Sequence, residues 1–415
     1  MRLRQTSLIA LAIGACLLAP NLAAADDTLK IGVLATLEGP FTILGQEGLR
    51  GVQVAVDEIG GSVAGKKIEI IKQATDASPD SAVRAARTLV EQKGVKLVIG
   101  PLSGDEGLAV KDYAKTKPDV TFVNGASASQ DFTLRSPAEN IFRFSTDGAQ
   151  WNAGLGTYVY QVKGYKKVAI VAEDYSFPYT QVFGFMAEFC KAGGRVASKS
   201  WVPIGNKDFS SVIAAIPDGV DAIYVALGGS DAVNFLSQYQ QAGGAAPLIG
   251  GSITVDQNVL QSKGKAREVL IGTPSSGPVA DLTDSPAWNA FAAAYKKQPD
   301  AFPSPSIFAQ SYYVDAKPLL MALQQTGADL SDGGKKLREV LSKISYESPT
   351  GKISLDKNRN AIADEFITEV AAAPDGTLYK KLVKVVSQTT QTLGFSEDEF
   401  IAMGPVGRDK PPCGK

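Results

Sequence analysis

Two loops rich in glycine and serine carry the residues best suited to bind an anion. They are Gly100-Pro-Leu-Ser-Gly-Asp-Glu-Gly107 and Asn124-Gly-Ala-Ser-Ala-Ser129, and each follows a strand-like hydrophobic run and leads toward a helix. Backbone N–H groups near a helix start, with the hydroxyls of Ser103 and Ser127, can receive a carboxylate without any basic side chain. Turn formation and helix capping use the same residue types, so each loop also fits a structural role. Neither loop has the pattern of a phosphate loop, a dinucleotide fingerprint or a nucleophile elbow.

Aromatic residues follow several of the predicted strands. Phe41 lies beyond the first strand, Tyr175 and Phe177 lie beyond a later one, and Phe308 belongs to a predicted helix. Aromatic walls with a few polar groups are typical of pockets that bind small molecules. Packing in the core is the alternative role, and we expect it for Tyr312. The sequence therefore predicts an aromatic wall close to the two anion-binding loops.

Histidine is absent from all 415 residues. This absence excludes Ser-His and Cys-His nucleophile pairs, a histidine general base and the commonest zinc ligand. Glu106, Asp174 and Lys207 remain available for other acid–base chemistry, but the sequence shows no convergent cluster around them. We therefore expect a binding protein and not an enzyme, and we expect neither a metal nor a cofactor.

The first 25 residues have the three-part pattern of a secretory signal peptide. Arg2 and Arg4 precede an apolar run at 8–19, and small residues up to Ala25 provide a cleavage site. The run is shorter than the roughly 20 residues that a membrane anchor needs. Lipid attachment at Cys16 is the alternative, although the apolar run continues beyond that residue. Cleavage after Ala25 predicts a periplasmic protein.

The mature chain is close to electrically balanced. Cleavage would remove two arginines and no acids, leaving 40 basic and 43 acidic side chains and a net charge of −3. This balance gives no reason to expect binding to nucleic acid. Cys190 and Cys413 remain after processing. In an oxidising compartment an even pair suggests a disulfide, and two separate thiols are the alternative.

The hydrophobic pattern alternates between strands and helices along the chain. The predicted strands are 29–34, 67–72, 95–99, 121–123, 141–145, 168–172, 195–202, 222–227, 248–250, 269–273, 351–355, 366–370 and 378–386. The predicted helices are 46–59, 79–90, 151–162, 179–192, 210–216, 231–242, 285–297, 306–325 and 334–343. Serial alternation predicts parallel sheets covered by helices, in two α/β blocks with a pause near 145–150. Such sheets bind ligands beyond the carboxyl ends of their strands, which is where the loops above lie.

Short motifs occur in a characteristic order from the first strand to the last. They are Leu29-Lys-Ile-Gly-Val-Leu34, Gly39-Pro40 with Gly45, Gly48-x-x-Gly51-x-x-x-Ala55, Asp76 with Asp80 and Ala82, Val98-Ile-Gly-Pro101, Phe142-Arg143 with Asp147, the segment 164–174 and Gly351-Lys-Ile-Ser-Leu-Asp356. Each motif is modest, but their order and spacing together are specific. Over nearly all of residues 27–390 the chain resembles the periplasmic solute receptors of ABC transporters related to the Leu/Ile/Val-binding protein, which have the type I periplasmic binding fold.

The resemblance implies two lobes, each a parallel-sheet Rossmann-like α/β sandwich, joined by three hinge crossovers. After the signal peptide 1–25, one lobe would combine 26–146 with 275–350, and the other would combine 147–274 with 351–405. Residues 406–415 would form a C-terminal tail. This topology places Cys190 and Cys413 on the same lobe, so we expect them to be bridged. The ligand would bind between lobes that close by a hinge motion.

In this family the ligand carboxylate is held by the loops that match Ser103-Gly104-Asp105 and Ala126-Ser127, and Tyr175 to Phe177 match the aromatic wall. The residues expected to bind the ligand are Phe41, Leu44, Ser103, Gly104, Asp105, Ala126, Ser127, Tyr175, Phe177, Gly229, Ser252, Ile253 and Phe308. The implied partner is an inner-membrane ABC permease, and the implied receptor is a monomer.

Two departures from the family pattern bear on the ligand. Members that bind α-amino acids place an acidic side chain for the ammonium group just after the strand that ends near Gly250, whereas this chain reads Gly251-Ser252-Ile253. Burying an unpaired ammonium is strongly unfavourable. The segment 228–230 is Gly-Gly-Ser where amino-acid binders have tyrosine-rich segments, which enlarges the site. We therefore predict an aromatic acid of the benzoate or cinnamate type. A receptor for branched-chain or other aliphatic amino acids and a ligand-sensing regulator of the same fold are the alternatives.

Overall fold

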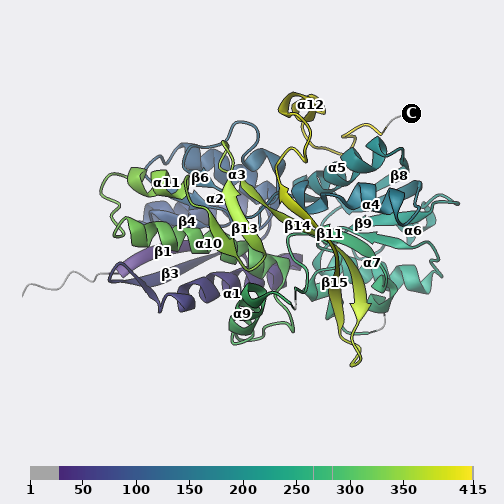
Figure 1. The fold of residues 1–415 in the computed structure, drawn as a ribbon, viewed down its shortest axis with the longest axis horizontal. Coiled ribbons are helices and arrows are strands. Elements are labelled where there is room, and N and C mark those ends of the chain that lie inside the picture. The colour runs from purple at the N-terminus through teal and green to yellow at the C-terminus, as the bar shows by residue number, and fades with distance from the viewer. Residues whose placement is uncertain (1–27, 265, 283, 414–415) are drawn as a thin grey trace, which may run out of the picture.

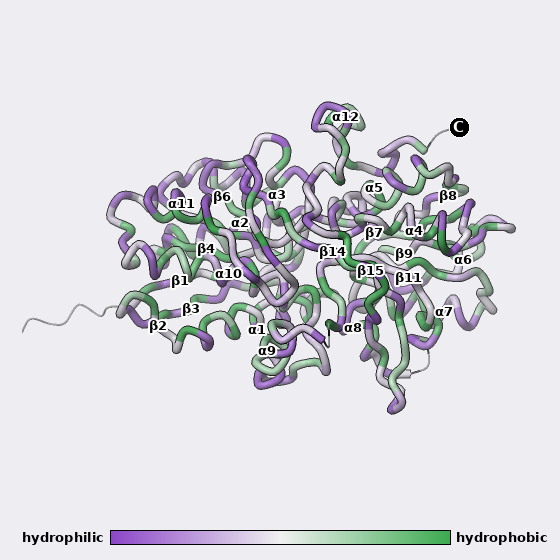
Figure 2. Tube along the Cα trace, in the orientation of Figure 1, coloured by the Kyte–Doolittle hydropathy of each residue, from purple (hydrophilic) through white to green (hydrophobic). Residues whose placement is uncertain are grey.

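The computed structural model of the chain describes residues 28–264, 266–282 and 284–413. Figure 1 shows two lobes side by side, with the C-terminal end of the chain beside the second lobe. The predicted signal peptide, its cleavage after Ala25 and the alternative lipid site at Cys16 lie outside the described residues. Hydrophobic residues gather along the strands inside each lobe, and hydrophilic residues gather in the outer loops and turns (Figure 2).

The first lobe is built on a sheet whose order in the described residues is β2-β3-β1-β4-β5-β6. Its strands are β1 (Thr28–Thr36), β2 (Ser62–Val63), β3 (Lys66–Thr75), β4 (Leu97–Ile99), β5 (Thr121–Val123) and β6 (Ile141–Phe142). All of the neighbours pair in parallel except β2 and β3. Its helices are α1 (Thr42–Glu58), α2 (Pro79–Arg87), α3 (Gly104–Lys115), α9 (Pro286–Tyr295), α10 (Ile307–Gln325) and α11 (Lys335–Leu341). Apolar side chains of α1 and α10 pack on one face of the sheet, and those of α2 and α3 pack on the other.

The second lobe is built on a sheet of order β12-β13-β14-β11-β10-β9-β7-β8, with β15 paired to β14, within the described residues. Its strands are β7 (Lys167–Glu173), β8 (Arg195–Val202), β9 (Ala222–Ala226), β10 (Leu248–Gly250), β11 (Pro274–Gly277), β12 (Tyr346–Ser348), β13 (Gly351–Leu355), β14 (Ala361–Ala372) and β15 (Leu378–Thr389). The helices are α4 (Leu155–Gln161), α5 (Ser176–Lys191), α6 (Ser210–Ala214), α7 (Gly229–Gln241), α8 (Gln257–Leu260) and α12 (Glu397–Ala402). Strands β7 to β11 run in parallel, and β14 and β15 form an antiparallel hairpin.

The fold class predicted from the alternating pattern is confirmed, but one predicted strand is wrong. The segment 269–273 is not a strand, because Ala266–Leu270 form a 3-10 helix and β11 begins only at Pro274. Leu270 is buried in the apolar core of the second lobe, so its hydrophobicity reflects packing. Gly272 has a φ of +81°, which does not fit an extended strand. The exact lobe boundaries stay predictions. Strands β11 and β12, which lie close to the boundaries expected at 275 and 350, both belong to the sheet of the second lobe.

A buried ion pair fastens the chain where it first passes between the lobes. Arg143 and Asp147 are fully buried, and their side chains approach to 3.6 Å. The Arg143 guanidinium donates to the Asn360 side chain at 2.6 Å, and the Gln391 amide donates to Asp147 at 2.9 Å. Asn360 directly precedes β14, and Gln391 follows the end of β15. Arg143 and Asp147 at the first crossover therefore hold together three segments that are distant in sequence: 143–147, the segment at Asn360 and the segment at Gln391.

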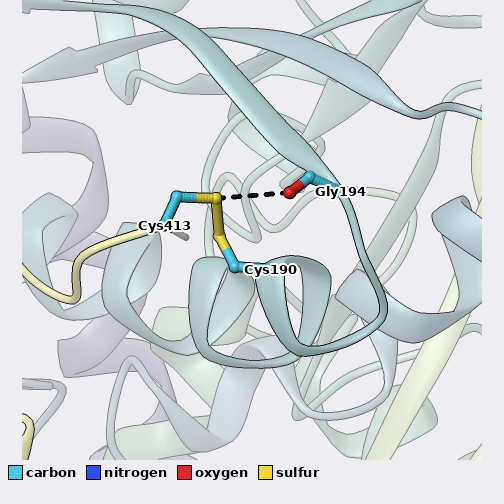
Figure 3. The surroundings of a disulfide bond; sticks show 3 residues. All are labelled: Cys190, Gly194 and Cys413. Atoms are coloured by element: carbon cyan, nitrogen blue, oxygen red, sulfur yellow. Dashed lines mark hydrogen bonds between the residues drawn. A yellow bond between two sulfur atoms is a disulfide. The ribbon is translucent and has the colours of Figure 1, made fainter. Parts of the chain in front are cut away.

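The C-terminal segment returns over the second lobe and is fixed there by a disulfide. Cys190 on α5 is bonded to Cys413, with an S–S distance of 2.02 Å (Figure 3). Arg408 in the same segment forms an ion pair with Asp174, which directly follows β7. The Phe400 side chain of α12 packs edge-on against Phe183 of α5 with ring centroids 5.4 Å apart. The tail is thus a packed part of the second lobe.

Candidate ligand-binding site

A small closed cavity lies between the two lobes at the carboxyl ends of their parallel strands. Its free volume is only about 10 Å³, roughly the space for one water molecule, so the side chains around it are almost in contact. The lining residues are Phe41, Leu44, Leu102, Ser103, Ala126, Trp151, Tyr175, Phe177, Ile253 and Phe308. All of them are buried. The wall is largely apolar, and a ligand larger than a water molecule would require the lobes to move apart or the lining side chains to shift.

The lining side chains come from both lobes because strand ends from both sheets face the cleft. Phe41 precedes α1, which follows β1, and Ser103 and Ala126 follow β4 and β5. Tyr175 follows β7, and Ile253 follows β10. Open parallel sheets bring such loops together at one edge. The positions predicted from strand order are therefore adjacent in space.

Aromatic rings surround the cavity on several sides. The Phe41 ring lies 6.1 Å from the Tyr175 ring, and the Tyr175 ring lies 6.1 Å from the Phe177 ring. The Trp151 ring meets the Phe177 ring edge-on at 5.5 Å and 69°. At these separations the rings contact one another, and the same ring faces could stack on, or meet edge-on, a flat ligand ring if the lobes part. Leu44, Ile253 and Phe308 complete the apolar wall.

The start of α3, next to the lining residue Ser103, has two backbone donors without an acceptor in the described chain. Ser103 caps this helix: its hydroxyl accepts from the Glu106 N–H at 3.3 Å, and the Glu106 side chain accepts from the Ser103 N–H at 2.8 Å. The reciprocal capping leaves the N–H groups of Gly104 and Asp105 without an acceptor among the described residues. These N–H groups and the positive end of the helix favour a carboxylate.

The structure does not bring five of the predicted residues to the cavity wall: Gly104, Asp105, Ser127, Gly229 and Ser252. The Ser127 N–H, predicted to bind the anion, instead donates to Pro101 O at 3.2 Å. The Ser252 hydroxyl accepts from the Gln181 amide at 2.5 Å. The Ser103 hydroxyl, although it lines the cavity, donates to Ala77 O at 3.0 Å. Local bonds therefore use the Ser127 N–H and the hydroxyls of Ser103 and Ser252, whereas the Ser127 hydroxyl is buried without a hydrogen-bond partner among the described residues.

Gly104 and Asp105 lie instead against the other lobe. The Asp105 carboxylate accepts from the Ser176 N–H at 3.2 Å, and the hydroxyls of Ser129 and Ser176 are 2.8 Å apart. A third contact between the lobes joins the Ile307 N–H to the Asp256 carboxylate at 2.8 Å. The lobes are thus closed over the cavity. Gly229 also lies at this junction, because a Cβ built there would be 2.9 Å from Pro40 O.

Two lining residues, Leu102 and Trp151, were not predicted. Leu102 lies inside the first glycine-rich loop, next to the predicted residue Ser103, so its position in that loop could have indicated that it lines the cavity. Trp151 lies in the 3-10 helix Gln150–Asn152, directly after the first crossover. A helix is expected at 151–162, but α4 begins only at Leu155. Neither periodicity nor strand order indicates that a crossover residue reaches the cleft.

Two buried acids lie near the cavity without lining it. The Glu173 carboxyl ends β7, and one of its oxygens accepts from the Gly228 N–H at 3.1 Å. Burial raises the pKa of Glu173 well above its ordinary value, and Asp231 raises that pKa further. Burial likewise raises the pKa of Glu106, although hydrogen bonds around the start of α3 oppose this effect. Among the described residues, no three cysteine, aspartate or glutamate side chains gather in a way that could hold a metal ion.

Comparison with known proteins places this site in a class. A periplasmic binding protein family profile matches residues 28–376, so the chain belongs to that family. This is a family of transport proteins that bind substrates, not a class of enzymes. The Leu/Ile/Val-binding protein homolog 6 of Brucella melitensis is 27% identical over 373 residues, which cover 87% of this chain and 92% of that protein.

Two solved structures have the same fold. One is a solute-binding protein of an ABC transporter from Rhodopseudomonas palustris BisB5 in complex with 3,4-dihydroxybenzoic acid. It is 26% identical, with a TM-score of 0.80 over 88% of this chain and 99% of that chain. The other is a leucine-binding protein from Thermotoga maritima, 21% identical, with a TM-score of 0.73 over 86% of this chain and 99% of that chain. The second likeness supports the type I periplasmic binding fold alone.

Proposed function

We propose that this protein is the substrate-binding receptor of an ABC importer and that its ligand is a small aromatic carboxylate without an α-ammonium group. The observation that carries the proposal is the closed, aromatic-walled cavity beside the free N–H groups of Gly104 and Asp105. The carboxylate would lie toward the start of α3. The ring would lie among Phe41, Tyr175 and Phe177.

The polar groups near the cavity support a ligand without an amine. The position where amino-acid receptors have an acid is Ser252, and its hydroxyl is bonded to Gln181. Glu173 is an alternative partner for an ammonium group, but burial and Asp231 raise its pKa and favour its neutral form. A neutral carboxyl group cannot compensate a buried ammonium.

Relatives support both ligand classes. The Rhodopseudomonas palustris protein was solved with 3,4-dihydroxybenzoic acid, which favours an aromatic acid. The Brucella melitensis relative is named for leucine, isoleucine and valine, which keeps a branched-chain amino acid as the second candidate. Both are only about a quarter identical to this chain. The composition of the cavity wall is therefore the stronger guide.

Family membership implies a periplasmic location and a membrane permease as the partner. We propose a monomer that delivers its ligand to an inner-membrane ABC permease. Within residues 28–413, apart from the gaps at 265 and 283, no helix has both the length and the apolarity needed to cross a bilayer. A ligand-sensing regulator of the same fold would bind a signalling partner instead of a permease.

Calorimetry with matched ligand pairs tests the proposal. Each pair consists of an acid and its α-amino counterpart: 3-phenylpropanoate with phenylalanine, and 3-(4-hydroxyphenyl)propanoate with tyrosine. Benzoate, 4-hydroxybenzoate, 4-coumarate, leucine and valine complete the set. We expect the amine-free aromatic acids to bind and their α-amino counterparts to bind at least about 100-fold more weakly, the cost of an unpaired buried charge. Micromolar binding of leucine or valine without binding of the aromatic acids would refute the ligand assignment.

A further inference from the structure

One hydrogen-bond donor in the cavity wall is unused. The indole Nε1 of Trp151 is buried and has no hydrogen-bond partner among the described residues. Trp151 lines the cavity and is 1% exposed. Buried indole N–H groups nearly always find an acceptor, because an unpaired donor away from water is costly. The acceptor for this N–H is therefore to be sought in the cavity.

The backbone that carries the indole ring is fixed by hydrogen bonds, and the ring itself meets Phe177 edge-on. The Trp151 backbone N–H donates to Asp147 O at 2.9 Å, and Asp147 is tied to the crossover through Arg143. The next side chain, Asn152, donates to Gly148 O at 3.0 Å and accepts from the Tyr224 hydroxyl at 2.8 Å. A donor fixed in this way adds specificity, since little conformational entropy is lost when it binds.

We propose that Trp151 Nε1 donates a hydrogen bond to an oxygen atom of the bound ligand and thereby helps to set the specificity of the receptor. The inference rests on the proposed function, because it assigns a role within the same cavity. An indole N–H is a donor only, so it can bind a carboxylate, hydroxyl or carbonyl oxygen but cannot pair with an ammonium group.

Packing alone does not explain a tryptophan at this position. Phe41, Phe177 and Phe308 form the same wall without a polar atom. A phenylalanine at position 151 would also meet Phe177 edge-on and would leave no unpaired donor. The unpaired indole N–H is therefore the feature that distinguishes Trp151 from a phenylalanine, and a ligand oxygen would provide its acceptor.

The test is Trp151→Phe, with Trp288→Phe as the matched control. Trp288 is also buried, at 3% exposure, but it does not line the cavity. The affinities of wild type and both variants are measured by calorimetry for 4-hydroxybenzoate and 4-methylbenzoate, which differ only in the ring substituent. Thermal unfolding without ligand checks that each variant is folded. We expect Trp151→Phe to lose at least about 10-fold in affinity, the usual scale for a hydrogen bond to a charged or polar group.

The two ligands identify the oxygen that is bound. An equal loss for both ligands assigns the hydrogen bond to the carboxylate, and a loss confined to 4-hydroxybenzoate assigns it to the ring hydroxyl. Affinities for both ligands within about 3-fold of wild type would overturn the inference. If the wild type binds leucine or valine and no aromatic acid, the proposed function fails by itself. Trp151→Phe is then measured with that amino acid, whose carboxylate offers the same acceptor.

Discussion

Glu173 is the single side chain that best separates the two ligand classes. Its carboxyl group lies at the carboxyl end of β7, with one oxygen bonded to the Gly228 N–H and the other without a partner in the described part of the chain. Tyr175, two residues further along the chain, lines the cavity. If the ligand carried an ammonium group, Glu173 would have to ionise to pair with it. If the ligand is an amine-free acid, Glu173 stays neutral.

Glu173→Gln distinguishes these cases, because glutamine has the shape of a neutral glutamic acid and keeps an acceptor for the Gly228 N–H. We expect the affinity for aromatic acids to change by less than about 3-fold, well under 1 kcal/mol. Calorimetry at pH 7 measures it. Loss of an ionised partner for a buried ammonium would cost about 3–5 kcal/mol. A decrease of 100-fold or more in the affinity for the natural ligand would therefore contradict the neutral role of Glu173.

At the residue scale, the sequence predicted the aromatic wall better than the polar contacts. Phe41, Tyr175 and Phe177 follow strands, so strand order places each at the carboxyl edge of its own sheet, and the family resemblance brings the two edges together. The Ser127 N–H could not be assigned from sequence, because its acceptor, Pro101 O, belongs to the neighbouring loop. Trp151 reaches the cavity only because the chain turns directly after the crossover. Such contacts depend on tertiary structure and leave no local pattern.

At the element scale, the starts of α3 and α5 face each other across the cleft. Gly104, the first residue of α3, has no side chain where Ser176 and Phe177 of α5 approach it. A Cβ built on Gly104 would lie 2.3 Å from Ser176 Oγ, 2.6 Å from Ser129 Oγ and 3.0 Å from the Phe177 backbone nitrogen. The glycine therefore permits the close approach of the two lobes.

Gly104→Ala should hinder closure, while within the first lobe the Ser129 hydroxyl has to move aside. Overpacking of this kind costs about 1–3 kcal/mol, so we expect ligand affinity to fall by roughly 10-fold or more. The thermal midpoint without ligand should be unchanged or higher, since alanine suits a helix better than glycine. Calorimetry measures affinity, and small-angle X-ray scattering with ligand measures closure. Gly407→Ala is the control, because no atom lies within 4 Å of a Cβ built there. Affinity equal to wild type in Gly104→Ala would show that α3 and α5 do not meet in the bound state.

Most helices and strands could be predicted from sequence, because each buries one face and its hydrophobic residues therefore recur with the period of a helix or a strand. Strands β5, β8 and β13 agree with the predicted residues, and α10 agrees to within one residue. Helix α3 was expected only as a region that follows the first glycine-rich loop. The strand predicted at 269–273 failed because a short apolar run can be buried in a turn as readily as in a strand. Periodicity records burial but not the backbone conformation of so short a segment.

At the scale of the whole molecule, the lobe order and the crossovers came from the family resemblance and not from periodicity. The pattern indicated two α/β blocks, and it carried no information on which late segments return to which lobe. The buried network of Arg143, Asp147, Asn360 and Gln391 shows why: its members are up to 248 residues apart in sequence and meet only in the folded chain. Each of these residues is polar, so hydrophobic patterning gives no signal for them.

A titratable contact between the lobes gives the molecule a specific dependence on pH. Asp256 of the second lobe accepts from the Ile307 N–H at the start of α10, and its other oxygen has no partner in the described structure. Burial raises the pKa of Asp256 to about 6, although the buried Lys380 lowers it in part. The ordinary value is 3.8. Between these values the folded protein holds a proton that the unfolded chain has lost.

Because the folded pKa is the higher one, Asp256 makes the free energy of unfolding fall as pH rises from about 4 to about 6. A difference of about two pKa units corresponds to about 3 kcal/mol. Asp256→Asn stays neutral and keeps an acceptor for Ile307. The variant should therefore lose this component, so that its stability decreases less than that of wild type between pH 4 and pH 7. Urea unfolding across this range measures the difference, and Asp218→Asn on the exposed surface is the control. Parallel pH curves for Asp256→Asn and wild type would mean that Asp256 ionises in the folded protein as it does in the unfolded chain.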